Sequence, residues 1–177
     1  FPSSQTVIRL GELGITHHND QFFPLLVGNY ILGGGALVSQ LSTEIREKRG
    51  LTYGVYSQFL PLPATGPFIV SLSTENAQAK EAVDVTLKTI ERFVQDGPSE
   101  QELTEAKQYL TGSFPLSLAS NGGIADILLK ISFYDLPQNY LDTYLDNINK
   151  TSTNEITRAF QNSIVVNQLI KVMVGKQ

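Results

Sequence analysis

Two side chains that can donate hydrogen bonds to a peptide oxygen stand seven positions apart in the sequence. Arg46 lies in the charged segment TEIREKRG, and Tyr53 follows the glycine that closes it. A guanidinium and a phenol are suitable donors to negative charge that develops on an oxygen atom. Each also has a plainer interpretation, because Arg46 fits a solvated cation in the last turn of a helix, and Tyr53 fits a core residue beside Val55 and Phe59. The spacing alone leaves both interpretations open.

The histidines are the next residues whose chemistry matters. The chain has only two, the adjacent His17 and His18, and no cysteine. A catalytic zinc site needs three protein ligands and a glutamate as general base. Neighbouring residues do not share a face of a helix or strand, and no Glu stands between or beside these two. We therefore expect both histidines to be solvated loop residues and this chain to hold no metal. Without cysteine, disulfides, thiolate zinc sites and thiol catalysis are excluded.

The segment from 31 to 57 must position Arg46 and Tyr53. A helix is predicted by apolar residues that recur every fourth position and so share one face: Leu37, Leu41 and Ile45. Three glycines precede this helix and are expected to separate it from the apolar segment before: Gly33, Gly34 and Gly35. They do not form a phosphate-binding loop, because no Lys-Ser/Thr pair follows them.

The predicted helix ends at a glycine and is followed by a strand. Gly50 stands where a left-handed residue ends a helix, and Leu51 can fold back on Ile45 in a Schellman-type closure. From there the period changes to two, which predicts a strand. One face of that strand carries Tyr53, Val55, Ser57 and Phe59. The tight turn is therefore expected to bring Arg46 close to Tyr53.

The run LGGG followed by SQLSTEIREKRGLTYGVYS resembles zinc metallopeptidases of the pitrilysin and mitochondrial-processing-peptidase family, in their second half. The resemblance covers nearly the whole chain. It implies two homologous halves, in one chain or two, of which one carries an inverted zinc motif and the other an Arg and a Tyr seven positions apart. In this sequence the latter two match Arg46 and Tyr53. The resemblance further implies that the Tyr stabilises an oxygen of the scissile peptide and that the Arg fixes a substrate carbonyl.

The same resemblance sets expectations for the cofactor, the partners and the substrate contacts. Zinc is expected in the partner half and none in this chain, and the partners are that zinc-bearing half and a peptide substrate. Some related enzymes hold substrate near a glycine-rich connector, so the loop of Gly33, Gly34 and Gly35 is a candidate contact. Related peptidases also bind substrate along a sheet edge. Whether the edge in this half binds substrate or is covered stays open.

The remaining patterns predict strands at the start, middle and end of the chain, with helices between them. Strands are expected at 5–10, 68–74 and 169–174. Helices are expected at 22–31, at 77–94, from 99 onward, at 124–134 and from 137 and 153 onward, and Pro115 is expected to kink or end the helix that begins at 99. Asp20 is expected to cap the first helix. The fold class is therefore α+β: a two-layer sandwich with a mixed, mainly antiparallel sheet and helices packed on one face. We expect residues 1–177 to form a single domain that is a fragment or one half of a longer two-domain peptidase.

Composition narrows the functional classes. The formal net charge of -4 gives no basic footprint, so nucleic acid is not an expected partner. No apolar run reaches the length of about 20 residues that spans a bilayer. The compartment stays open, and a periplasmic or other extracytoplasmic location is compatible with the sequence. Besides a non-catalytic peptidase half, two alternatives remain: a scaffold or assembly subunit that kept the fold and lost the chemistry, and an independent peptide- or ligand-binding module.

Overall fold

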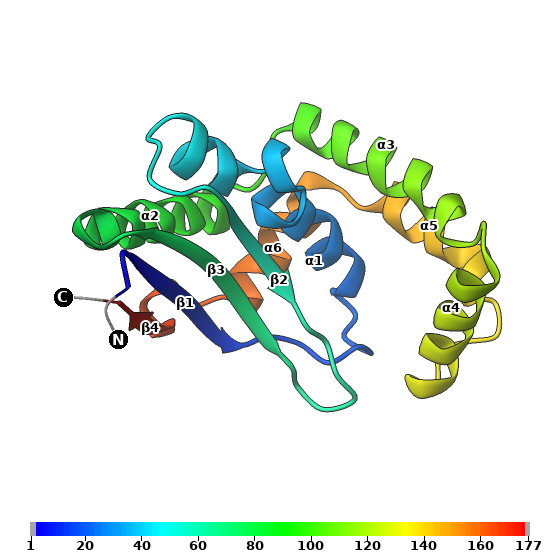
Figure 1. Ribbon diagram of the computed structural model, residues 1–177. Helices are drawn as coiled ribbons and strands as arrows, with labels where there is room; N and C mark the ends of the chain where they lie inside the picture. The colour runs from blue at the N-terminus through cyan, green and yellow to red at the C-terminus, as the bar shows by residue number, and fades with distance from the viewer. Residues whose placement is uncertain (1–2, 176–177) are drawn as a thin grey trace.

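The computed structural model describes residues 3–175 as an antiparallel sheet with helices on one face (Figure 1). The sheet has four strands in the order β2-β3-β1-β4. The strands are β1 (Gln5–Leu13), β2 (Val55–Phe59), β3 (Pro67–Glu75) and β4 (Ile170–Val174). Every neighbouring pair in this order is antiparallel, and one isolated parallel bridge joins Thr16 to Leu62. The predicted α+β class, with a mainly antiparallel sheet, is confirmed.

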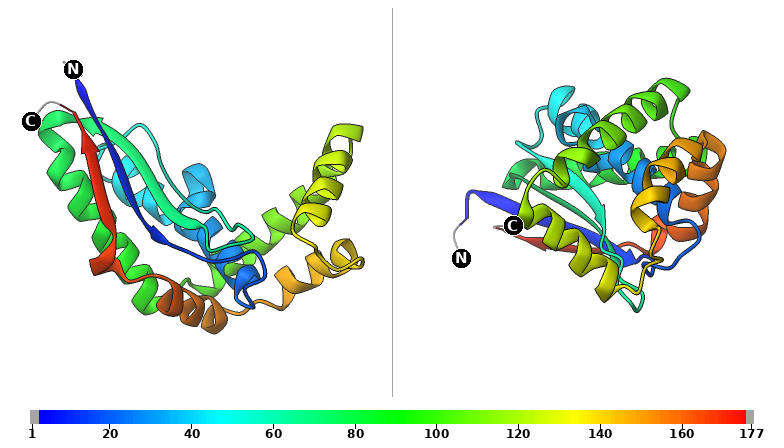
Figure 2. Two further views of the ribbon diagram at one scale, coloured as in Figure 1. Left: turned by 90° about the horizontal axis from the view of Figure 1, so that it is seen from below. Right: turned by 90° about the vertical axis from the view of Figure 1, so that its right-hand side faces the viewer.

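The helices form a layer behind the sheet and an arm beside it. They are α1 (Phe22–Asn29), α2 (Ala79–Asp96), α3 (Glu100–Ser117), α4 (Asn121–Phe133), α5 (Tyr140–Lys150) and α6 (Thr153–Ser163). Short helical turns are η1 (Tyr30–Gly34), η2 (Ala36–Val38), η3 (Ser42–Glu47), η4 (Asn76–Gln78) and η5 (Val166–Gln168). Helices α1, α2 and α6 pack behind the sheet, and its other face is open (Figures 1 and 2).

The core lies between the sheet and these three helices. Alternate residues of the central strands are fully buried on the helix side, including Ile8 and Leu10 of β1 and Phe68 and Val70 of β3. Helix α1 is central, as its apolar sequence predicts. It approaches α6 so closely that a Cβ on Gly28 would lie 2.5 Å from the Phe160 ring. The edge strand β4 is exposed along its whole length.

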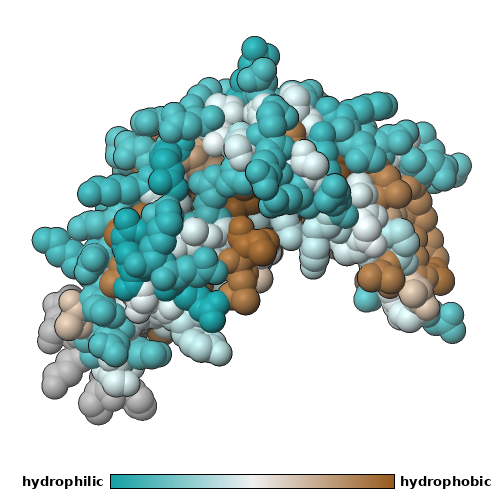
Figure 3. Space-filling model, turned by 90° about the horizontal axis from the view of Figure 1, so that it is seen from above, coloured by the Kyte–Doolittle hydropathy of each residue, from teal (hydrophilic) through white to brown (hydrophobic). Residues whose placement is uncertain are grey.

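Helices α3, α4 and α5 form an arm that extends away from the sheet (Figure 2). Stacked aromatic rings hold the arm together, for example Phe114 on Tyr144 with 4.3 Å between ring centroids. In Figure 3 the molecule is an arch, and apolar side chains gather on the right-hand arm. The exposed apolar residues of α4 are Ile124, Leu128, Leu129 and Phe133.

The glycine run and the helix after it differ from the prediction. Gly33 and Gly34 do not break the first helix, because a π-helical turn continues α1 through them, and the break falls at Gly35 and Ala36. Leu37 is 56% exposed in the short turn η2, so it does not share the buried face of Leu41. The predicted period of four fails here because Ser39 is extended and the helical geometry restarts after it.

The end of that segment follows the prediction. Gly50 has a φ of 63°, in the left-handed region. Its amide donates to the carbonyl of Arg46 at 2.9 Å, and the amide of Leu51 donates to the carbonyl of Ile45 at 3.0 Å. The closure is of the Schellman type but spans one residue more than the usual motif, because the preceding turn η3 is π-helical.

Helix starts elsewhere are partly as expected. Ser99 forms the predicted capping box with Glu102, and Ser152 forms a second one with Glu155. Asp20 does not cap α1. The N-cap is Gln21, whose amide donates to Asn19 Oδ1, so the prediction for Asp20 is wrong.

Candidate functional site

Arg46 lies in the last turn before the glycine closure. Its guanidinium makes no ion pair within the described residues, although Glu44 stands two positions away. The Glu44 carboxylate is already occupied, since Lys48 and Arg49 each approach it to 2.7 Å. Hydrogen bonds from those two cations lower the pKa of Glu44 to about 2. Arg92 also lies 3.6 Å from this carboxylate, so Glu44 is engaged by three other cations and Arg46 has no ion-pair partner among residues 3–175.

Tyr53 is held outward by a rigid segment. The residues before it are buried and tied to β3, because Thr52 Oγ1 donates to the carbonyl of Ser73 at 2.6 Å and Thr74 Oγ1 donates to the carbonyl of Leu51 at 2.5 Å. The Tyr53 side chain itself is 91% exposed. The strand begins at Val55, two residues later than predicted. The interpretation of Tyr53 as a core residue is therefore wrong.

The structure brings Arg46 and Tyr53 together as the sequence predicts. The Arg46 Cζ atom lies 5.5 Å from the centroid of the Tyr53 ring, in cation–π contact. At exposed sites such a contact contributes about 0.5–1 kcal/mol. Within residues 3–175 neither the guanidinium hydrogens nor the phenol oxygen takes part in a hydrogen bond.

The glycine run packs against strand β2. A Cβ on Gly33 would overlap Ser57 Oγ and lie 2.6 Å from the Ser57 amide nitrogen. Asn29 Nδ2 donates to the carbonyl of Ser57 at 3.1 Å, and Asn29 Oδ1 accepts from its hydroxyl at 2.8 Å. At its middle, the β2 edge is therefore covered by α1 and η1 rather than free to accept an added strand. Gly33 is required for this close packing; Gly34 is exposed and Gly35 half-buried.

The two histidines do not form a metal site. Between residues 3 and 175, no group of three or more His, Cys, Asp or Glu side chains is arranged to hold a metal ion. His18 is exposed as expected, but the prediction for His17 is wrong, because that side chain is 5% exposed. Its ring is stacked between Phe22 and Tyr134, at centroid distances of 4.6 and 4.1 Å. A zinc ion with its three ligands does not fit these residues.

Comparison with known proteins gives the family. A family model described as the peptidase M16 inactive domain matches residues 2–110. YmxG of Helicobacter pylori, described as a non-peptidase homolog, is 31% identical over 152 residues, which are 84% of this chain and 34% of that protein. A protein of Bacillus subtilis described as the uncharacterized zinc protease YmxG is 30% identical over 118 residues, 67% of this chain and 29% of its own length. The chain spans about a third of the length of these relatives.

Solved structures that are similar to this chain agree with the family match. A structure described as the peptidase M16 inactive domain from Pseudomonas fluorescens has a TM-score of 0.94 and 36% identity, and the match covers 100% of this chain and 42% of that one. A putative zinc protease from Bordetella pertussis has a TM-score of 0.81 over 100% of this chain and 97% of its own, and its 14% identity shows the fold alone.

No helix within residues 3–175 is both long and apolar enough to cross a bilayer. The family match, the similar proteins and the shared fold indicate the same family. This chain belongs to the peptidase M16 family of zinc proteases, and its matched region is the inactive domain of that family.

Proposed function

We propose that this chain is the substrate-binding, non-catalytic half of a zinc-dependent endopeptidase, and that Arg46 and Tyr53 contact the peptide. The observation that carries this proposal is the contact between an unpaired guanidinium and a 91% exposed phenol. The Tyr53 ring is not buried, and Arg46 has no ion-pair partner among residues 3–175. Both side chains would therefore be accessible to a ligand outside this chain.

In this proposal each of the two residues has its own task. The guanidinium offers several N–H donors in a fixed plane and suits a backbone carbonyl of the peptide. The phenol offers one O–H donor to an oxygen that gains negative charge during hydrolysis. Zinc and the general base belong to the homologous half, in the same polypeptide or in a partner subunit. The two halves would enclose the peptide in a chamber, and residues 1–177 would form a single domain of that assembly.

The covered middle of β2 narrows how a peptide can lie on this half. Because Asn29 and η1 occupy the edge at Ser57, the peptide is recognised by side chains at the start of β2 rather than by an added strand along it. The exposed glycine Gly34 leaves room for a direct contact with substrate at the glycine loop.

The proposal is tested with the full-length protein, or with this chain combined with a separately encoded zinc-bearing half. Arg46→Ala is expected to raise KM for a peptide substrate, since a carbonyl contact made in the ground state is lost. Arg158→Ala removes an exposed arginine of α6 and is the matched control. Unchanged KM and kcat in Arg46→Ala would remove Arg46 from substrate binding.

A second candidate function is a scaffold subunit that kept the fold without the chemistry. It is favoured by one observation, the similarity to a Helicobacter pylori protein described as a non-peptidase homolog. The two functions differ in a simple measurement. Zinc-dependent peptide hydrolysis by the assembled protein supports the peptidase half, and an assembly without hydrolysis, whose stability is unaffected by Arg46→Ala, supports the scaffold.

A further inference from the structure

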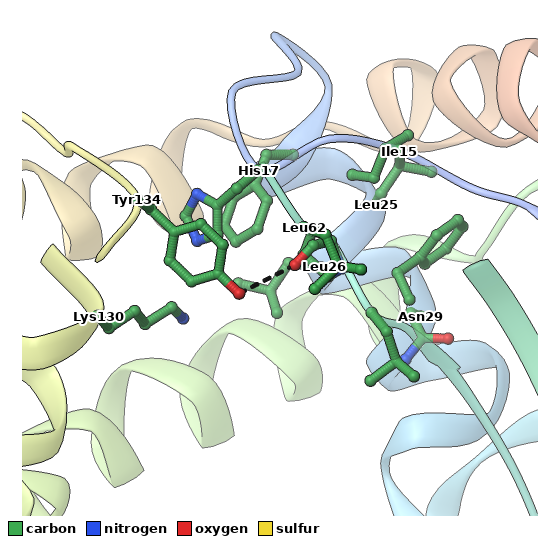
Figure 4. Close-up of a pocket in the computed structure, with 12 residues that line it drawn as sticks. Ile15, His17, Leu25, Leu26, Asn29, Leu62, Lys130 and Tyr134 are labelled. Atoms are coloured by element: carbon green, nitrogen blue, oxygen red, sulfur yellow. Dashed lines mark hydrogen bonds between the residues drawn. The ribbon is translucent and has the colours of Figure 1, made fainter. Parts of the chain in front are cut away.

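A small pocket lies where α1, the β2–β3 hairpin and the arm helix α4 meet (Figure 4). Its volume is about 300 Å³, roughly twice the engineered cavity of about 150 Å³ that binds benzene. Most of its wall is apolar: Ile15, Phe22, Leu25, Leu26, Phe59 and Leu62 are among the lining residues. The pocket is at the end of β2 away from Tyr53, so it is separate from the Arg46–Tyr53 pair.

One wall of this pocket carries a buried polar group with no partner. Both ring nitrogens of His17 are buried, and within the described residues neither has a hydrogen-bond partner. The ring is stacked on Phe22 and Tyr134 and is one of the residues that line the pocket. A neutral imidazole has one N–H donor and one acceptor. Leaving both unpaired in the interior is unfavourable, so this ring is suited to a ligand in the pocket.

A lysine side chain also lines this pocket. Lys130 of α4 lines the pocket, and Figure 4 shows its ammonium below the Tyr134 ring. No carboxylate of the described residues lies within 4.0 Å of it, although Asp126 stands one helical turn earlier. The Tyr134 hydroxyl already donates to the carbonyl of Pro61 at 3.1 Å. The polar end of the pocket is therefore lined by the Lys130 ammonium and by the His17 ring, whose two nitrogens have no partner among the described residues.

We propose that this pocket binds a carboxylate attached to an apolar chain or ring. The carboxylate would accept hydrogen bonds from Lys130 and His17, and the apolar part would fill the space lined by Leu26, Phe59 and Leu62. Burial lowers the pKa of His17 to about 4, so its ring is neutral at pH 7 and donates one hydrogen. A free carboxylic acid and the C-terminal residue of a peptide both present this chemistry.

The test uses octanoate as the probe, titrated calorimetrically into the full-length protein at pH 7. Octanamide has the same length without the charge. A hydrogen bond to a charged group contributes enough that octanoate is expected to bind about tenfold or more tighter than octanamide. Lys130→Met should weaken octanoate binding about tenfold and leave octanamide binding unchanged. Lys88→Met, at an exposed lysine of α2, should change neither.

NMR signals of the histidine rings show independently where octanoate binds. Octanoate should shift the ring signals of His17 and leave those of the exposed neighbour His18 in place. His17→Phe keeps the stacking and removes the donor, so it should weaken octanoate binding, whereas His18→Phe should not. A dipeptide ending in leucine, compared with its C-terminal amide, shows whether the natural source is a peptide end: tighter binding than octanoate supports a peptide end, and weaker binding supports a free acid.

Equal affinity for octanoate and octanamide, no binding of either, or full octanoate affinity in Lys130→Met would overturn the assignment. These outcomes are independent of the peptidase proposal, because they concern neither hydrolysis nor the Arg46–Tyr53 pair.

Discussion

The buried ring of His17 predicts an unusual response of stability to acid. Burial and, to a lesser extent, the Lys130 ammonium hold the pKa of His17 at about 4 in the folded chain, against 6.5 for an ordinary histidine. Between pH 6.5 and about pH 4 the unfolded state therefore binds more protons than the folded state. By linkage, the contribution of His17 to the free energy of unfolding falls as the pH is lowered through this window and is constant below it.

The magnitude follows from the two pKa values of about 4 and 6.5. At 1.36 kcal/mol for each pH unit, the loss attributable to His17 is up to about 3 kcal/mol. In His17→Phe this loss should disappear. At pH 7 the variant should also be more stable than the parent by about 1–3 kcal/mol, because two buried nitrogens without partners are replaced by carbon. The stability gain of the variant is thus expected to grow from pH 7 to pH 4.

The assay is urea unfolding of the 177-residue chain, followed by far-UV circular dichroism at pH 7, 6, 5 and 4. Its readout is the difference between His17→Phe and the parent, so that groups common to both, such as Glu12, cancel. His18→Phe is the control, since that ring is exposed. If His17→Phe keeps the parent's pH dependence between 6.5 and 4, the ring is not buried and neutral as described.

Three further perturbations test the packing and the charges. Gly33→Ala should lower the unfolding free energy by about 1–3 kcal/mol, because the added Cβ meets Ser57. Gly112→Ala, in open space on α3, should instead raise the unfolding free energy by about 0.5–1 kcal/mol. Chemical denaturation measures both changes, and equal effects would contradict the close approach of Gly33 to Ser57. Glu44→Gln should lower the free energy of unfolding by about 1 kcal/mol at pH 7, a modest value because the partners of Glu44 are partly exposed. Since the pKa of Glu44 is about 2, the variant should also lose less unfolding free energy than the parent when the pH is lowered from 4.5 to 2. Ser99→Ala should cost about 1 kcal/mol through loss of the cap, and a change in melting temperature below 1 °C would refute that role.

Local signals in the sequence predicted local structure well. The capping boxes of Ser99 and Ser152 and the left-handed Gly50 depend only on residues a few positions away, so their chemistry is visible in the sequence. The contact of Arg46 with Tyr53 was predictable for the same reason, because one glycine turn joins the two residues.

Long-range packing decided what could not be predicted. His17 is buried because Tyr134, more than a hundred residues later, stacks on its ring. No sequence pattern around His17 predicts that Tyr134 is its partner. Leu37 is exposed because the chain turns at Gly35 and Ala36 before helical geometry resumes, and a period of four cannot show such an interruption. The pocket at α4 was missed since its lining comes from four separate segments.

The Arg46–Tyr53 pair also limits what the scaffold alternative can explain. The peptidase proposal requires a phenol that is exposed beside a guanidinium, as Tyr53 is at 91% exposure, whereas a subunit without chemistry does not require it. Such an exposed pair has little effect on stability, since a contact of this kind contributes about 0.5–1 kcal/mol.

The most direct measurement of the central claim is kcat/KM for peptide hydrolysis by Tyr53→Phe in the full-length protein assembled with its zinc-bearing half. Loss of one donor to a developing oxyanion costs about 2.7–4 kcal/mol, so kcat/KM should fall about 100-fold or more, with the folded state unchanged. Tyr56→Phe, at an exposed tyrosine of β2, should retain the parent value. If Tyr53→Phe hydrolyses the peptide as fast as Tyr56→Phe, the phenol has no part in the reaction.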